Sequence, residues 1–241
     1  MDRPRAHAAE IGQHRPVTLE DLTRKKDRRA QDRAALDALL DEVLVGTLST
    51  VTQDGRPWVV PMLFARDGDR LLLHGSTGAG ALRQVAAGAE AAFCAYAVDG
   101  LVLASSMFDH SANYRSAVVR GPLVTLTGDE AWAALDAVSD GLLPGRREEV
   151  RPMLAKEVAA TVALALDLTD DNWILKVRTG GTGEDPADVP ADVWTGVVPV
   201  QPAYGEPEPT PGQEALPVPA SVERLRFGRG GIPDREDHRS R

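Results

Sequence analysis

Three short segments of this 241-residue chain carry side chains suited to binding a ligand. One is a strand-like run in which Ile174, Lys176 and Arg178 alternate with apolar residues, so both cations project from one face. A planar guanidinium fork and an ammonium together suit an anion, above all a phosphate. The same spacing also fits the solvent-exposed face of an edge strand, and the spacing alone does not separate the two interpretations.

The second segment is the glycine-rich run His74-Gly75-Ser76-Thr77-Gly78-Ala79-Gly80, which stands between a predicted strand and a predicted helix. Free backbone N–H groups and the helix dipole favour an anion at such a place, and glycines allow a ligand to approach the backbone. The run lacks the Gly-Lys-Ser/Thr ending of a Walker loop and the parallel strand and acid that follow a Rossmann fingerprint. An ordinary turn with an N-cap residue explains the run equally well.

The third segment begins at Asp109 and places seven polar or titratable side chains before a strand. Alternation puts Tyr114 and Ser116 on one strand face and Arg115 on the other. Hydroxyls can therefore meet a ligand while the guanidinium reaches another surface. The alternative is that the side chains of His110, Asn113 and Arg115 donate hydrogen bonds to turn carbonyls at this loop-to-strand junction.

The chain offers no metal-ligating or nucleophilic constellation. His74 and His110 are far apart in sequence with no carboxylates at zinc-ligand spacing, and the other histidines fall near the two ends. No Gly-x-Ser-x-Gly elbow occurs, and the single cysteine, Cys94, stands in an apolar run typical of a buried thiol. We therefore expect neither a catalytic metal nor an ordinary hydrolase.

The charge balance excludes further classes. The chain has 27 Lys plus Arg against 36 Asp plus Glu, a net charge of −9, whereas nucleic-acid binding draws on clustered cations. It has no apolar run of about 18 residues and no apolar core of a signal peptide. A lone cysteine suits a reducing compartment. We expect a cytoplasmic protein that binds neither nucleic acid nor membrane.

The elements that must position these side chains follow from periodicity. Apolar residues three and four apart after Asp32 predict one helix, and Asp129 as an N-cap opens another. Gln53-Asp54-Gly55-Arg56 predicts a hairpin turn between the first two strands. The predicted strands cover residues 43–51, 58–65, 70–74, 91–98, 101–107, 113–126, 161–168 and 172–178. Besides the helix after Asp32, the predicted helices cover residues 81–87, 129–142 and 148–160.

The first three predicted strands form a meander. Pro57 and Pro61 should leave the second strand exposed along one edge or bulged, since proline cannot donate to a ladder, and Gly121-Pro122 predicts a kink in the long strand. Strands at hairpin spacing, with helices inserted between them, predict an α+β fold, mainly β, built on an antiparallel barrel. We expect a polar N-terminal extension over 1–31, one domain over 32–180 and a proline-rich arm over 181–241, docked at first and loose at its end.

Four motifs, taken in their order, carry a resemblance to a known family. They are Gly55-Arg56-Pro57-Trp58-Val59-Val60-Pro61, Leu73-His74-Gly75-Ser76, Asn113-Tyr114-Arg115-Ser116-Ala117-Val118-Val119 and Lys176-Val177-Arg178-Thr179-Gly180. Together they resemble the pyridoxamine 5'-phosphate oxidase-like flavin-binding split barrels, closest to the branch that includes nitroimidazole-resistance-type proteins. The resemblance covers residues 32–199. It implies a homodimer of six-stranded split β-barrels with two FMN molecules in the clefts between subunits.

The resemblance also implies a set of cofactor-binding residues. Some would line the flavin ring, others would lie near the ribityl phosphate, and the basic end of the last strand would hold an anion. Relatives often carry an Arg-Lys pair just after the glycine turn, where this chain has Ala79-Gly80 or Gly80-Ala81, and Arg83 one turn on would replace it. The set is Val60, Pro61, Met62, His74, Gly75, Ser76, Thr77, Arg83, Tyr114, Arg115, Ser116, Lys176, Arg178 and Trp194.

Three functions are consistent with this resemblance. The first is a flavin-dependent oxidoreductase acting on an unknown small molecule, with redox chemistry supplied by FMN and with His74 and Tyr114 as catalytic candidates. The second is a non-catalytic flavin or haem binding or storage protein, with His74 or His110 as the axial ligand of a haem. The third is a deazaflavin-dependent reductase, in which Arg115 and Arg120 would meet the longer acidic tail of that cofactor.

Overall fold

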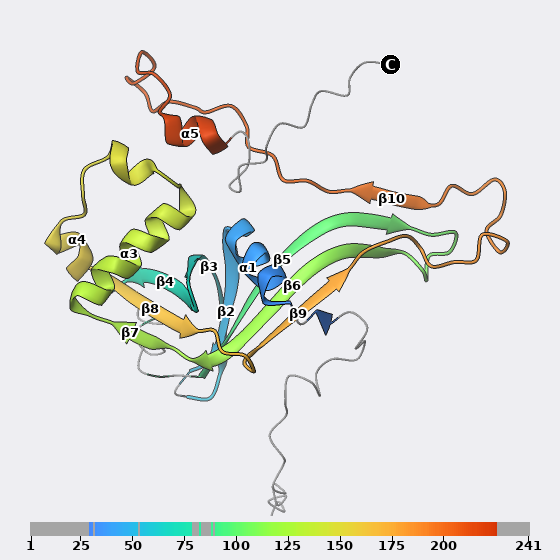
Figure 1. Ribbon diagram of the computed structural model, residues 1–241, viewed down its shortest axis with the longest axis horizontal. Coiled ribbons are helices and arrows are strands. Elements are labelled where there is room, and N and C mark those ends of the chain that lie inside the picture. The colour runs from blue at the N-terminus through green and yellow to red at the C-terminus, as the bar shows by residue number, and fades with distance from the viewer. Residues whose placement is uncertain are drawn as a thin grey trace, which may run out of the picture.

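Antiparallel pairing dominates the computed structural model, which describes residues 29–30, 32–52, 54–78, 82, 88 and 90–225. Ten strands form one sheet in the order β1-β9-β6-β5-β2-β3-β4-β8-β7, and β10 pairs with β5. Figure 1 shows the long strands β5 and β6 reaching well beyond the barrel. The strands are β1 (Arg29–Ala30), β2 (Val45–Val51), β3 (Pro57–Asp67), β4 (Arg70–Ser76), β5 (Glu90–Leu103), β6 (Ser111–Pro122), β7 (Val124–Leu126), β8 (Thr161–Asp167), β9 (Trp173–Arg178) and β10 (Gly196–Pro199). The predicted fold class, mainly β and antiparallel, is confirmed.

Helix α1 (Arg33–Glu42) begins where the sequence predicts it. The Asp32 side chain accepts a hydrogen bond from the Ala34 N–H at 2.9 Å, which satisfies one of the free donors at the helix start. Leu36, Leu39 and Leu40 are buried and join the cluster that fills the barrel. The helix ends before Val43, so that residue leads into β2.

The predicted meander β2-β3-β4 is confirmed. Gly55 at φ +80° makes the turn from β2 into β3, a conformation that favours glycine. β3 pairs with β2 from Pro57 to Leu63, but with β4 only from Phe64 to Asp67. The first half of β3 therefore has one unpaired edge among the described residues, as its prolines predict.

Two strand boundaries differ from the sequence prediction. The two strands predicted over 91–98 and 101–107 are one continuous strand, β5, with a register shift between Val98 and Gly100. Asp99 stands at that bulge and pairs with Arg115 on β6, so the Asp-Gly pair bends a strand instead of turning the chain. The predicted strand 113–126 divides at Leu123, because β6 pairs with β5 and β9 while β7 pairs with β8.

The helices that cover the barrel differ in detail. α3 (Gly128–Leu142) forms as predicted, but its N-cap is Thr127 and Asp129 lies in the first turn. The helix predicted over 148–160 is interrupted: a 3-10 turn, η2 (Arg146–Glu149), and the short α4 (Ala155–Ala159) flank Pro152. Proline lacks an N–H and disfavours helix at the preceding residue. The helix predicted over 81–87 lies outside the described residues, apart from Leu82.

Two apolar clusters hold the sheet. One fills the barrel around Phe64 and Phe93, whose rings meet edge to face with centroids 4.8 Å apart. The other lies between α3 and the outer side of β4 and β8, where Leu72 and Leu135 pack together. β4 and β8 therefore form a wall that is apolar on both sides. Among the described residues, no helix is long and apolar enough to cross a membrane.

The arm after residue 180 returns along the molecule. β10 pairs with Gly100–Leu103 of β5, and the chain then runs back to α5 (Ala220–Leu225), which lies beside the α3 end of the protein (Figure 1). The Ser221 N–H and hydroxyl both donate to the Glu149 carboxylate, at 3.0 and 2.5 Å. Arg224 donates to the Pro144 carbonyl at 3.2 Å. Both ends of the described arm are thus attached to the barrel domain.

Candidate functional site

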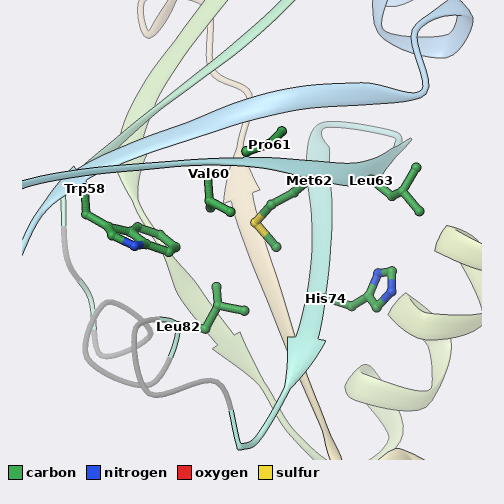
Figure 2. A pocket seen from close by; sticks show the side chains of 7 residues that line it. All are labelled: Trp58, Val60, Pro61, Met62, Leu63, His74 and Leu82. Atoms are coloured by element: carbon green, nitrogen blue, oxygen red, sulfur yellow. The ribbon is translucent and has the colours of Figure 1, made fainter.

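A pocket of about 290 Å³ lies where the barrel is split between β3 and β4. Among the described residues, β3 has no second neighbouring strand before Phe64, which leaves room for the pocket beside the strand. Figure 2 shows the side chains around this gap, which come from β3, from β4 and from the segment after β4. They are Trp58, Val60, Pro61, Met62, Leu63, His74 and Leu82.

One side of the pocket is an apolar surface. Trp58, Val60 and Met62 alternate along β3, point toward Leu82 and pack against the barrel core (Figure 2). A Cβ on Gly75 would collide with the Leu82 side chain, so this glycine allows Leu82 to close the pocket floor. The structure thus gives Gly75 a packing role that the sequence did not predict.

His74 contributes the titratable group of the pocket. It follows Leu72 on the outer side of β4 and stands next to a helix in Figure 2. Its Nδ1 atom is buried and has no hydrogen-bond partner among the described residues. Burial lowers the pKa of the imidazole from its usual 6.5, so the neutral form is favoured at pH 7. A neutral imidazole with an unused nitrogen can bind a polar ligand atom or a metal centre.

The free edge of β3 adds backbone groups to the pocket. Between Pro57 and Leu63 this strand is hydrogen-bonded on the β2 side alone within the described part of the chain. An unpaired strand edge presents N–H donors and C=O acceptors, although Pro57 and Pro61 have no N–H. A flat ligand with a polar rim and an apolar body would match both the edge and the side chains beside it.

The turn after β4 is held by its own hydrogen bonds. The Thr77 N–H and hydroxyl both donate to the Ala160 carbonyl, at 3.0 and 3.1 Å, and the Ser76 hydroxyl accepts from the Gly78 N–H at 3.2 Å. These groups are already engaged in tying the turn to α4, which matches the interpretation as an ordinary turn. Arg83, predicted to support a phosphate here, lies outside the described residues.

The sheet brings four predicted residues together away from the pocket. Tyr114 pairs with Arg178 and Ser116 with Lys176 across β6 and β9, so by register they share the face that points away from the barrel interior, here named the outer face. Arg178 donates to Asn113 Oδ1 at 2.6 Å and to the Gly181 carbonyl at 3.2 Å, which are neutral acceptors. Within the described chain no carboxylate forms an ion pair with Lys176 or Arg178.

Arg115 has a different environment. It points to the opposite side of β6, as alternation predicts, and its guanidinium pairs with Glu42 at 2.6 Å and Asp99 at 2.7 Å. These two carboxylates raise the pKa of Arg115. The contacts join α1, the β5 bulge and β6, which is a structural use of this side chain. Its predicted part in a cofactor site stays a prediction.

Two further predicted residues lie at the far end of β5. Trp194 comes just before β10, and the first residue of β10 pairs with Leu103 at the end of β5. This end of the sheet lies far from β3 and β4, which form the pocket (Figure 1). His110 is exposed and its Nδ1 accepts a hydrogen bond from the Ala104 N–H at 3.1 Å.

The sequence did not predict Trp58, Leu63 and Leu82 as pocket residues. The alternation along β3 was a usable signal for the first of these.

These features define an antiparallel split barrel with an apolar ligand pocket beside an unpaired strand edge. A model of the pyridoxamine 5'-phosphate oxidase family matches residues 32–172, and the chain belongs to that family. The resemblance predicted from the four motifs is therefore confirmed. A comparison with curated proteins gave no match.

Solved structures agree with this assignment. The FAD and haem binding protein from Mycobacterium smegmatis is 41% identical, with a TM-score of 0.80, over 84% of this chain and 98% of that one. The flavocytochrome Anf3 from Azotobacter vinelandii is 30% identical, with a TM-score of 0.76, over 86% and 95%. A protein assigned to 5-nitroimidazole antibiotic resistance in Bacteroides thetaiotaomicron shares the fold at 19% identity and a TM-score of 0.52, over 62% and 86%.

Proposed function

We propose that this protein binds a flavin in the pocket between β3 and β4, and that it acts as a flavin-dependent oxidoreductase on a small molecule. The observation that carries the proposal is the combination of an apolar pocket with an unpaired strand edge. The isoalloxazine ring common to FMN and FAD has an apolar benzenoid end and a polar pyrimidine end. Similarity to an FAD and haem binding protein and to a flavocytochrome supports this assignment.

The pocket residues fit such a ring by their chemistry. Trp58, Val60 and Met62 would contact its apolar body, and the backbone of β3 would meet its polar rim. The unpartnered Nδ1 of His74 would gain a hydrogen-bond partner, which removes the cost of burying it alone. A bound flavin supplies hydride or electron transfer. This chain's side chains would orient the ring, exclude water and present a neutral imidazole at its edge.

We propose further that the protein is a homodimer formed through the outer face. This face of the sheet exposes large apolar side chains from β3, β2, β5 and β10, and exposed apolar side chains grouped on one face mark a surface that another molecule covers. Its members are Val45, Val59, Leu63, Tyr96, Val98, Leu101 and Val198. A second copy would cover this face and would bring Lys176 and Arg178 toward a cofactor phosphate.

The first test is the absorption spectrum of the purified protein, followed by mass analysis of the released cofactor, which separates FMN from FAD and from deazaflavin. The second is the double variant Lys176→Ala with Arg178→Ala. Loss of two charge-assisted contacts should weaken flavin binding by about tenfold or more. The matched control is Lys156→Ala with Arg147→Ala, two exposed cations away from the outer face, which should leave binding unchanged. Equal affinity of both double variants would refute the phosphate role.

A haem is the second candidate ligand, because His74 offers a neutral imidazole with a free nitrogen beside an apolar pocket. A Soret band in the purified protein, lost in His74→Ala and kept in His110→Ala, is the expected result for this function. A protein that shows a flavin spectrum and no Soret band after reconstitution with hemin would contradict it.

A further inference from the structure

Both prolines of β3 occupy positions whose backbone groups point away from β2. The Thr52 N–H donates to the Arg56 carbonyl at 2.8 Å, where β2 turns into β3. In an antiparallel pair every second residue exchanges hydrogen bonds with the residue opposite. The even-numbered residues of β3 therefore bond to β2, and Pro57 and Pro61 fall between them. Neither proline removes a hydrogen bond from this ladder, so the fold does not explain why a proline stands at position 61.

The same alternation turns the backbone groups of Val59 and Pro61 toward the open edge of β3. An ordinary strand edge presents both an N–H and a C=O group at every second residue. Pro61 has no N–H, so the carbonyl groups of Val59 and Pro61 follow each other along the edge with no donor between them. Within the described chain no second strand pairs with this stretch. The edge at Pro61 therefore presents only acceptors to the pocket.

The side chains that flank Pro61 do not supply the missing donor. Val60 and Met62 stand on either side of it in the chain and are apolar (Figure 2). Of the seven residues that line the pocket, Trp58 and His74 carry a side-chain nitrogen and none carries a side-chain oxygen. Polar recognition at Pro61 thus falls to backbone carbonyls, which accept a hydrogen bond but cannot donate one.

We infer that Pro61 makes the pocket hold a reduced flavin more tightly than an oxidised one. The inference rests on the proposed function, in which the polar rim of the ring meets β3. Two electrons and a proton, taken together from a hydride-donating reductant, convert ring N5 from a hydrogen-bond acceptor into an N–H donor. The reduced ring can donate this N–H to a carbonyl of the edge, whereas the lone pair of oxidised N5 would face acceptors alone.

The preference for the reduced ring has a measurable consequence. One hydrogen bond corresponds to an affinity difference of about tenfold between the two forms. For a two-electron couple, a tenfold difference raises the midpoint potential of the bound flavin by about 30 mV above that of the free flavin. Pro61 is thereby a specificity-determining residue for the oxidation state, and the direction suits a flavin that accepts a hydride from its substrate.

The test restores the missing N–H. Pro61→Ala and Pro61→Gly both place a donor at this position and keep the ladder with β2, while they differ in side chain. Pro57→Ala is the matched control, because it adds the same N–H to the same edge about 13 Å away, at a residue outside the pocket lining. Each full-length protein is loaded with FMN or FAD, whichever the wild type binds. The midpoint potential is then measured by equilibration with a reference dye.

Both Pro61 variants should lower the potential of the bound flavin by about 30 mV, a tenfold change in the affinity ratio, because the new N–H serves oxidised N5. The dissociation constant of the oxidised flavin should fall in both variants. That of the matching 5-deaza analogue, which carries C–H at this ring position, should not fall. Pro57→Ala should have the wild-type potential.

The outcomes separate the inference from the proposed function. An unchanged potential in both Pro61 variants, an equal shift in Pro57→Ala, or an equal gain in affinity for the 5-deaza analogue would each overturn the inference while flavin binding stands. A wild-type protein that takes up neither FMN nor FAD would refute the proposed function and the inference with it.

Discussion

Gly46 on β2 is the position where one methyl group should disturb the barrel most. A Cβ there would fall on ring carbons of Phe93 and lie 3.1 Å from the Cys94 carbonyl oxygen. β2 is paired with β3 on one side and β5 on the other, so its backbone cannot move away. In Gly46→Ala the ring of Phe93 must therefore leave its place against Phe64.

The expected loss follows from these contacts. Overpacking a core costs about 1–3 kcal/mol, and the edge-to-face contact of Phe93 with Phe64 adds about 0.5–1.5 kcal/mol. Gly46→Ala should thus lower the free energy of unfolding by about 2–4 kcal/mol, and the urea midpoint by about 1–2 M with an unchanged slope. Gly205→Ala is the control, because nothing lies within 4 Å of a Cβ at that position.

A double-mutant cycle tests the cause. Phe93→Leu removes the ring that meets the new methyl group, so Gly46→Ala should cost at least about 1 kcal/mol less in that background. Additive losses from the two substitutions would refute the collision with Phe93 as the reason. A Gly46→Ala protein as stable as the wild type would refute the packing of β2 against Phe93 altogether.

Three further predictions concern single polar groups. Burial lowers the pKa of His74 from 6.5, so below that pH the unfolded chain takes up a proton that the folded chain does not. As the pH falls, the free energy of unfolding should therefore decrease by up to about 1.4 kcal/mol per pH unit. Urea titrations at pH 7.5 and 5.5 measure this dependence, and His74→Gln should remove it. Asn113→Leu should cost about 1–3 kcal/mol in thermal unfolding, because Arg178 loses its acceptor at 2.6 Å; an unchanged midpoint would contradict this. Hydrogen bonds from Ser221 lower the pKa of Glu149 from 4.5, so the packing of α5 against the barrel domain should weaken as the pH falls below 4.5. At pH 7, Ser221→Ala should speed amide hydrogen exchange in α5. Equal exchange rates in the variant and the wild type would disprove the contact.

Local sequence signals predicted the parts of the fold that depend on neighbouring residues. Asp32 as a cap and the leucine spacing that follows predict α1, and the Asp-Gly pair before β3 predicts its turn. Pro57 and Pro61 predict the unpaired edge on which the pocket depends. The same local signals failed where a distant partner intervenes. The sequence predicts two strands on either side of Asp99-Gly100, yet they form one long strand with a bulge where Asp99 pairs with Arg115.

Part of the pocket was predicted from the family resemblance. Val60, Pro61, Met62 and His74, which the resemblance grouped around the cofactor, all line the pocket. Leu82 was not foreseen, because its place depends on the fold of the segment after β4 and on the missing side chain of Gly75. The family resemblance grouped Arg115 with the cleft; its guanidinium pairs with Glu42 and Asp99, and its part in a cofactor site stays a prediction.

The sequence by itself determined the mainly β class and the strand that carries the pocket, because hydrophobic period, turn chemistry and proline positions act over a few residues. The order of four motifs carried the resemblance to the family. The tertiary structure alone decided which strands are neighbours, and that Trp194 and the exposed pair Met107 and Phe108 lie at the far end of β5. Those relations depend on barrel closure and on burial of apolar faces between segments far apart in the chain, which no local pattern encodes.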